Sequence, residues 1–367
     1  MRILLVSLYG RGGMIHYSSQ LANALGKDND VAIIIPSYTD LKYFDTNINI
    51  KLIRAPPSVI LSLLYFFNIF AFMKLYAFIK SYNPDIIHFL NEHPYNNIIH
   101  CMIKCKTVLT CHDPVAHTGE RNKLVMSFFN LNEFYQLKRV DKIIVHGKTL
   151  FKDLTQKNID QEKIVVIPHG DYSFFEKFAE SDIEEDNTIL FFGRIKPYKG
   201  IKYLIEAEKI ISKAAKDYKV IIAGEGDITP YNKDIANNHK FIIINRYIDD
   251  TEVALLFKKS VMVVLPYIEA SQSGIIPIAY AFKKPVVVTD VGSISEVVAD
   301  NKTGFIVPPK DSHALAAAIL KLLNNHELRI NMGENAYKKM KEEMSWDKIA
   351  IETLKVYKEE KNDKKIP

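Results

Sequence analysis

The strongest constraint on the fold is an alternation of short apolar runs with segments of helical periodicity, which occurs twice along the chain. The runs of the first half are RILLVS, VAIII, DIIHF, TVLT, KIIVH and KIVVI, and they stop just before Pro168. Those of the second half are TILFFG, KVIIAG, FIIIN, VMVVLP, PVVVTD and GFIVPP. Strands that alternate with helices form parallel sheets. The sequence therefore predicts an α/β fold with two Rossmann-like parallel-sheet domains facing across a cleft.

The boundary between the two halves is the stretch DYSFFEKFAESDIEEDN, residues 171–187, which is acidic toward its end and has no period. It is typical of an interdomain linker. We therefore expect an N-terminal domain over 1–170 and a C-terminal domain over 188–344. A last helix from about Ser345 to Lys361 has an apolar side and is followed by a charged tail.

The net charge of the whole chain excludes few classes of binding partner, since 48 basic and 43 acidic residues leave a charge of only +5. Residues 1–170 carry 19 basic and 13 acidic residues, a mild indication of an anionic partner such as a membrane surface. Nucleic acid is not expected, because no basic run is interleaved with aromatics. A solvated basic face is an equally good interpretation.

The apolar stretch Val59 to Ile79 is interrupted by Asn68 and Lys74, so it predicts a helix that packs on the sheet or lies in a bilayer interface.

The three cysteines, Cys101, Cys105 and Cys111, are an odd number in one short stretch. This is typical of a reducing cytoplasm and not of a disulfide framework. His100 and His112 flank them, but the spacing lacks the paired CxxC form of structural zinc sites, so packing is favoured over metal binding. The N-terminal MRILLVSLYG begins as a strand and leaves no room for an export signal, which predicts a cytoplasmic protein. Such a protein could also bind at the inner face of the cell membrane.

The first glycine cluster, GRGG at 10–13, lies between the first apolar run and a helical segment. A dinucleotide motif would need a third small residue where Ile15 stands, and no acidic residue ends the second run, so nicotinamide binding is disfavoured. Gly12 and Gly13 still allow backbone amides to approach an anion or a sugar. A plain tight turn explains them equally well.

The second cluster, FFGRIKPYKG at 191–200, combines a strand end, a basic loop and a helix start. Arg194 offers a planar fork and Lys199 a mobile ammonium, both where a diphosphate would sit at the carboxyl end of a strand. Two solvated surface cations are the alternative interpretation.

Two further strand ends carry small residues. In AGEGD, Gly224 and Gly226 permit close approach of a ligand, although the motif is weak alone. In SQSGI, Ser273, Gly274 and Ile275 open a helix whose free amides could meet a second face of the diphosphate. A simple capped helix is the alternative.

Two polar side chains complete the candidate site. His112, in TCHDP, follows a strand and is suited to orienting a hydroxyl near neutral pH, although core histidines are common. Glu269, in LPYIE, follows another strand and precedes SQSG. Both are candidate catalytic residues together with Arg194 and Lys199.

As an ensemble these motifs resemble the retaining glycosyltransferases of GT-B fold, glycosyltransferase family 4 or group 1. The resemblance covers nearly the whole chain, from the glycine turn through TCHD, PHG, GR with KG, GEG, TDVGSISEVV and TGFIVPP to the closing SW helix. It implies that Arg194 and Lys199 stabilise the departing nucleoside diphosphate and that His112 lies beside the transferred sugar. It also implies that Glu269 touches sugar hydroxyls and that the last helix crosses back to the first domain.

One position departs from that family. The second Glu, which usually follows the first by eight positions and binds the ribose, is Pro277 here, so the chain resembles a QSG-type subgroup and the ribose contact is left open.

The resemblance implies transfer of a hexosyl unit from a UDP- or GDP-sugar, with retention, to a saccharide or lipid-linked acceptor in polysaccharide or glycolipid biosynthesis. No metal cofactor is expected, because no Asp-x-Asp motif follows a strand and the two cations substitute for it. The alternatives are a nucleotide-sugar epimerase of the same fold, which would need no acceptor, and an inactive sugar-nucleotide-binding subunit.

Overall fold

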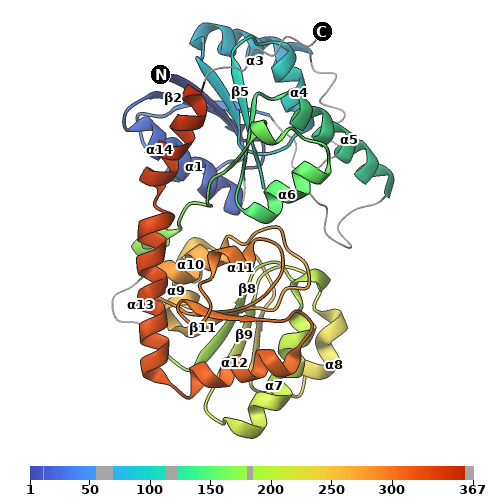
Figure 1. Cartoon of the computed structure of the whole chain (residues 1–367), viewed down its shortest axis with the longest axis vertical. Helices are drawn as coiled ribbons and strands as arrows, with labels where there is room; N and C mark the ends of the chain where they lie inside the picture. The colour runs from blue at the N-terminus through green and yellow to red at the C-terminus, as the bar shows by residue number, and fades with distance from the viewer. Residues whose placement is uncertain (11, 55–68, 113–122, 180–184, 360–367) are drawn as a thin grey trace. The chain divides into compact units, whose positions relative to one another are not determined.

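The computed structural model describes residues 1–359 except 11, 55–68, 113–122 and 180–184 (Figure 1). The chain divides into two compact units. The first contains the described residues up to Gly170 together with those from Trp346 onward, and the second contains Asp171–Ser345. The last helix, α14 (Trp346–Lys358), is thus part of the first unit.

The first unit is built on a seven-stranded parallel sheet in the order β3-β2-β1-β4-β5-β6-β7. Its strands are β1 (Arg2–Val6), β2 (Asp30–Pro36), β3 (Asn49–Ile53), β4 (Ile86–Phe89), β5 (Lys106–Cys111), β6 (Lys142–Val145) and β7 (Ile164–Val166). The chain order reverses between β1 and β4, which marks the topological switch point of this sheet.

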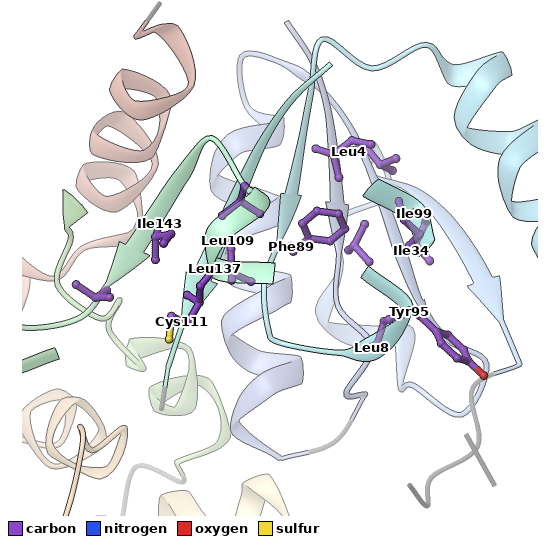
Figure 2. Close-up of a cluster of buried hydrophobic side chains, with 14 of the residues drawn as sticks. Leu4, Leu8, Ile34, Phe89, Tyr95, Ile99, Leu109, Cys111, Leu137 and Ile143 are labelled. Carbon is purple, nitrogen blue, oxygen red and sulfur yellow. The ribbon is translucent and has the colours of Figure 1, made fainter. Parts of the chain in front are cut away.

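Helices cover both faces of the first sheet. They are α1 (Gly13–Gly26), α3 (Ile69–Tyr82), α4 (Pro94–Cys101), α5 (Lys123–Arg139), α6 (Lys148–Gln156) and α14, with short 3₁₀ turns η1 (Leu41–Tyr43) and η2 (Gln161–Lys163). One core cluster joins one face of the sheet to side chains of α3, α4, α5 and α6, and part of it is drawn in Figure 2. The other cluster joins the opposite face to α1 and α14. Both faces are therefore buried, as continuous apolar strands require.

The second unit contains a six-stranded parallel sheet in the order β10-β9-β8-β11-β12-β13. Its strands are β8 (Thr188–Phe192), β9 (Lys219–Ala223), β10 (Phe241–Ile244), β11 (Ser260–Leu265), β12 (Val286–Thr289) and β13 (Gly304–Val307). The chain order reverses between β8 and β11, so ligands of an open α/β sheet are expected at the carboxyl ends of these two strands.

The helices of the second unit connect these strands in turn. They are α7 (Ile201–Ala214), α8 (Asn232–Ile235), α9 (Asp250–Lys259), α10 (Ile275–Ala281), α11 (Ile294–Val297), α12 (Ser312–Leu323) and α13 (His326–Glu343), with 3₁₀ turns η3 (Ser173–Phe178), η4 (Pro197–Lys199) and η5 (Thr229–Tyr231). Helix α7 packs against α12, and α10 packs against α13.

The predicted fold class, two parallel-sheet α/β domains, is confirmed, and each of the twelve predicted apolar runs overlaps a strand. The edge strand β3 was not predicted. The stretch 171–187, interpreted as a linker, begins with η3, which packs against α9 and α10 and buries Phe174 and Phe175. The apolar part of this stretch therefore belongs to the core of the second unit.

The apolar stretch Val59 to Ile79 lies partly outside the described residues. From Ile69 it forms α3, in which Leu75 and Ile79 are buried in the core while Phe70, Met73 and Tyr76 are exposed. Within the described ranges no helix is both long and apolar enough to cross a bilayer. The three cysteines, all of them among the described residues, form no disulfide, and Cys111 is buried while Cys101 is exposed.

Candidate functional site

Two loops meet at the switch point of the second sheet. One follows β8 and runs from Gly193 to Gly200, and the other follows β11 and runs from Pro266 to Glu269. The backbone N–H of Ile268 donates to the carbonyl of Tyr198 at 2.7 Å. Gly200 has φ +68°, and a Cβ there would lie 1.8 Å from the carbonyl oxygen of Pro266. Only glycine permits this approach, so the loops are joined through their backbones.

Arg194 and Lys199 both lie on the first of these loops and both contact tyrosines. The Arg194 side chain is exposed, and its Nη2 donates to the Tyr198 hydroxyl at 3.4 Å. The Lys199 ammonium lies 3.7 Å from the centre of the Tyr267 ring and 5.2 Å from that of Tyr198. Two cations are thus held at one strand end, which is suited to binding an anion with several oxygens.

Gly224 and Gly226 are explained by backbone packing inside the unit. A Cβ on Gly224 would lie 2.1 Å from the carbonyl oxygen of Gly193, and one on Gly226 would lie 2.1 Å from that of Ile195. The N–H of Ile195 donates to the Glu225 carbonyl at 2.9 Å. The two glycines therefore hold the backbone on either side of Arg194, and their assignment as donor-binding residues stays a prediction.

Glu269 is exposed on the β11 loop, where its N–H points to the Tyr198 carbonyl at 3.5 Å. Ser273, Gly274 and Ile275 lead into α10, which is only seven residues long. The Ser273 hydroxyl accepts from the N–H of Ile275 at 3.3 Å, the geometry of a simple turn at a helix start. Pro277 is buried within α10.

The glycine turn of the first unit is more open. Gly12 has φ +58°, and among the described residues no atom beyond its chain neighbours lies within 4 Å of a Cβ placed on it, while Gly13 is the first residue of α1. The positive φ explains the glycine at position 12 without a ligand. Sugar or anion binding by Gly12 and Gly13 stays a prediction.

His112 follows β5 in the first unit and is half-buried. Its Nε2 donates to the carbonyl of Leu90, the residue after β4, at 2.9 Å. The Tyr17 ring packs against it in an edge-to-face arrangement, with ring centres 4.8 Å apart. These contacts fix the orientation of the imidazole, and its Nε2 proton is used in a hydrogen bond to the backbone.

Two more histidines follow the next two strands in the same way and were missed as site residues. His146 follows β6 and His169 follows β7, and the ring centre of His146 lies 4.8 Å from that of His112 and 5.0 Å from that of His169. Burial lowers the pKa of His169 to about 4 and holds that of His146 well below its ordinary value. The signal was a histidine directly after a predicted strand, repeated in TCH, IVH and IPH.

A further histidine of the same sheet, His88, is hydrogen-bonded to two hydroxyl groups. His88 of β4 bonds through Nε2 to the Thr110 hydroxyl at 2.8 Å and through Nδ1 to the Tyr357 hydroxyl of α14 at 2.6 Å. Burial lowers the pKa of His88 to about 3. The first unit thus contains histidines in or just after four adjacent strands, and burial favours the neutral form of His88, His146 and His169.

Comparison with known proteins assigns both halves of the chain. Residues 173–339 match the family model of glycosyl transferases group 1, and residues 11–170 match that of glycosyltransferase family 4. The two models together account for most of the sequence, and the chain belongs to the glycosyltransferases that combine these domains.

Three similar proteins illustrate this placement. An uncharacterized glycosyltransferase of Methanocaldococcus jannaschii is 34% identical over 48% of this chain, which spans 45% of the relative's length. The O-antigen chain mannosyltransferase C of Escherichia coli is 24% identical over 78% of each chain. The structure of Anabaena HepE in complex with UDP and glucose superposes with a TM-score of 0.75 at 15% identity, covering 97% of this chain and 98% of that one. The fold is therefore GT-B, and both family models describe the chain as a glycosyltransferase.

Proposed function

We propose that this glycosyltransferase moves a hexosyl unit from a UDP- or GDP-sugar to a saccharide or lipid-linked acceptor, with retention at the anomeric carbon. The observation that carries the proposal is the pair Arg194 and Lys199 at the switch point of the second sheet. Cleavage of the bond between the sugar and the diphosphate leaves the bonding electron pair on the terminal phosphate, which gains one negative charge, and fixed cations lower the barrier by meeting that charge as it develops.

The other residues take the roles that the family resemblance gives them. His112 orients a hydroxyl of the transferred sugar, and its ring is held for this by Leu90 and Tyr17. Glu269 binds sugar hydroxyls from the loop that also supports Lys199. Anabaena HepE, whose structure contains UDP and glucose, supports a nucleoside-diphosphate donor for the shared fold.

The proposal includes transfer without a catalytic metal ion, because two side-chain cations supply positive charge at the leaving group. Activity should persist in EDTA. Activity lost in EDTA and restored by Mg²⁺ or Mn²⁺ would contradict this part.

The donor is identified by a panel of UDP- and GDP-sugars. A ligand at about 100 times its dissociation constant stabilises the folded state by roughly 2.7 kcal/mol, which a thermal-shift assay detects. Slow release of nucleoside diphosphate should accompany the same sugar nucleotide and rise when acceptor is added. Conversion of the donor to an isomeric sugar nucleotide without diphosphate release would instead identify an epimerase. Nuclear magnetic resonance of the product's anomeric proton distinguishes retention from inversion.

We also propose peripheral contact with a membrane surface through α3. Phe70 is 74% exposed and Met73 62% exposed, with Lys74 exposed between Met73 and the buried Leu75. Apolar and basic side chains on one helix suit the interface of an anionic bilayer. Flotation with anionic liposomes should recover the protein at low salt, and Phe70→Ser with Met73→Ser should reduce recovery. Ile330→Ser, which changes an exposed apolar residue of α13, is the control.

A further inference from the structure

We infer that Tyr267, together with Tyr198, is a positioning residue that fixes the Lys199 ammonium through the faces of two aromatic rings. The inference rests on the proposed function, because it assigns to Lys199 the charge that the diphosphate needs. It adds a requirement beyond the motif residues Arg194 and Lys199, namely an aromatic ring at position 267.

The geometry of the contact is that of a cation on an aromatic face. The Lys199 Nζ lies 3.7 Å from the centre of the Tyr267 ring, well inside the limit of about 6 Å for cation–π attraction. The Tyr198 ring lies 5.2 Å away and its hydroxyl accepts from Arg194. The same two loops thus hold both cations through tyrosines.

The Tyr267 ring is itself immobile. The residue is fully buried, and its carbonyl accepts from the Thr289 hydroxyl at the end of the neighbouring β12 at 2.6 Å. A fully buried ring whose backbone is held by a hydrogen bond can define the position of a flexible lysine side chain. Ordering that side chain before the donor binds removes an entropic cost from the reaction.

The Tyr267 hydroxyl does not explain the presence of tyrosine. Within the described part of the chain it is buried and has no hydrogen-bond partner. A buried hydroxyl without a hydrogen-bond partner lowers the stability of the folded state. The favourable contact of the Tyr267 side chain is therefore made by its ring. Phenylalanine should therefore replace Tyr267 without loss of function.

Aromatic rings hold a cation without cancelling its charge. Among the described residues Lys199 forms no ion pair with a carboxylate, unlike Lys283, which is paired with Glu334. A carboxylate partner would compete with the diphosphate for the ammonium and weaken its effect on the leaving group. The rings leave the full positive charge available.

The experiment compares donor turnover in four single variants. Tyr267→Met keeps a bulky apolar side chain and removes the ring, Tyr267→Phe keeps the ring, and Lys199→Ala removes the cation. Phe257→Leu is the matched control, because it truncates a fully buried aromatic residue of the same unit on α9. We expect Tyr267→Met to lower kcat about tenfold, and Tyr267→Phe and Phe257→Leu to stay within about twofold of the parent.

The double variant Lys199→Ala with Tyr267→Met separates positioning from general destabilisation. If Tyr267 acts through Lys199, its substitution should change kcat less than about twofold once the lysine is absent. An equal loss in both backgrounds, or a loss in Tyr267→Phe as large as in Tyr267→Met, would overturn the inference. A Lys199→Ala protein with parental activity would instead overturn the proposed function.

A second measurement does not depend on the folding of Tyr267→Met. Fluorinated phenylalanines at position 267 keep the shape of the ring and withdraw electron density from its face. We expect log kcat to fall steadily with the number of fluorines. An activity independent of fluorination would show that the ring only fills space.

Discussion

Buried histidines make the first unit sensitive to mild acid. Burial lowers the pKa of His88 to about 3, and the pKa values of His93 and His169 to about 4. In the unfolded chain these imidazoles titrate near 6.5. The unfolded state therefore binds more protons than the folded state below that value, and the free energy of unfolding falls as the pH decreases from about 6.5 toward 4. Above pH 7 these imidazoles are neutral in both the folded and the unfolded state, so their protonation does not lower the free energy of unfolding.

The size of the effect follows from the same pKa values. At pH 5.5 an unfolded histidine is about nine-tenths protonated, while the folded ones remain neutral, so each costs about 1.4 kcal/mol of stability. The three together cost about 4 kcal/mol, a large part of the 5–15 kcal/mol that is usual for a folded domain. His146 adds to this loss, since burial and the neighbouring His112 and His169 also hold its pKa far below the ordinary value.

The assay is urea unfolding at pH 7.5 and 5.5, followed by fluorescence of Trp346. This is the single tryptophan, and it lies in the first unit beside Tyr17 and His169. In His88→Gln the loss between the two pH values should be smaller than in the parent by about 1.4 kcal/mol. His313→Gln, at an exposed position of α12, should match the parent. A His88→Gln protein with the parent's full pH dependence would refute the argument that burial keeps His88 neutral.

Two further predictions concern the second unit. Arg194→Ala and Lys199→Ala should each lower turnover by about 10² to 10³ without a comparable loss of melting temperature, because a preorganised donor to a developing charge is removed; near-parental rates would show that this loop does not hold the donor. Gly200→Ala should destabilise the second unit in urea unfolding by more than about 2 kcal/mol, because its Cβ would lie 1.8 Å from the Pro266 carbonyl oxygen. Gly12→Ala, also at positive φ but with open space around it, should cost only about 1 kcal/mol in the first unit, and equal losses would contradict the role of the Gly200 contact.

Most of the fold was predictable because strands buried on both faces are continuous apolar runs. Strand β3 escaped prediction because it lies at the sheet edge, where Asn49 and Lys51 interrupt the apolar pattern of NIKLI. In the acidic stretch after Gly170 the charge pattern was given more weight than Phe174 and Phe175, and these two side chains decide the local structure by entering the core.

The candidate site was predictable only where charge was part of the motif. Arg194 and Lys199 could be found because cations at a strand end have few structural uses. Tyr198 and Tyr267 could not, since a tyrosine beside a strand is indistinguishable in sequence from core packing. The role proposed for them depends on two loops coming together, and the two tyrosines are 69 residues apart in the sequence. His146 and His169 carried a signal, the repeated histidine after a strand, but single core histidines are common enough to hide it.

The glycines show why local reasoning about ligand sites has a limit. Gly224 and Gly226, at a strand end, were interpreted as space for a ligand, yet at both positions, as at Gly200, the carbonyl of another loop lies where a Cβ would be. Their effect on chemistry is indirect, because those contacts join the β8 loop to the loops after β9 and β11 and so determine where Arg194 and Lys199 point. The close approach of these carbonyls is sufficient by itself to require glycine at the three positions, whether or not a ligand also contacts them.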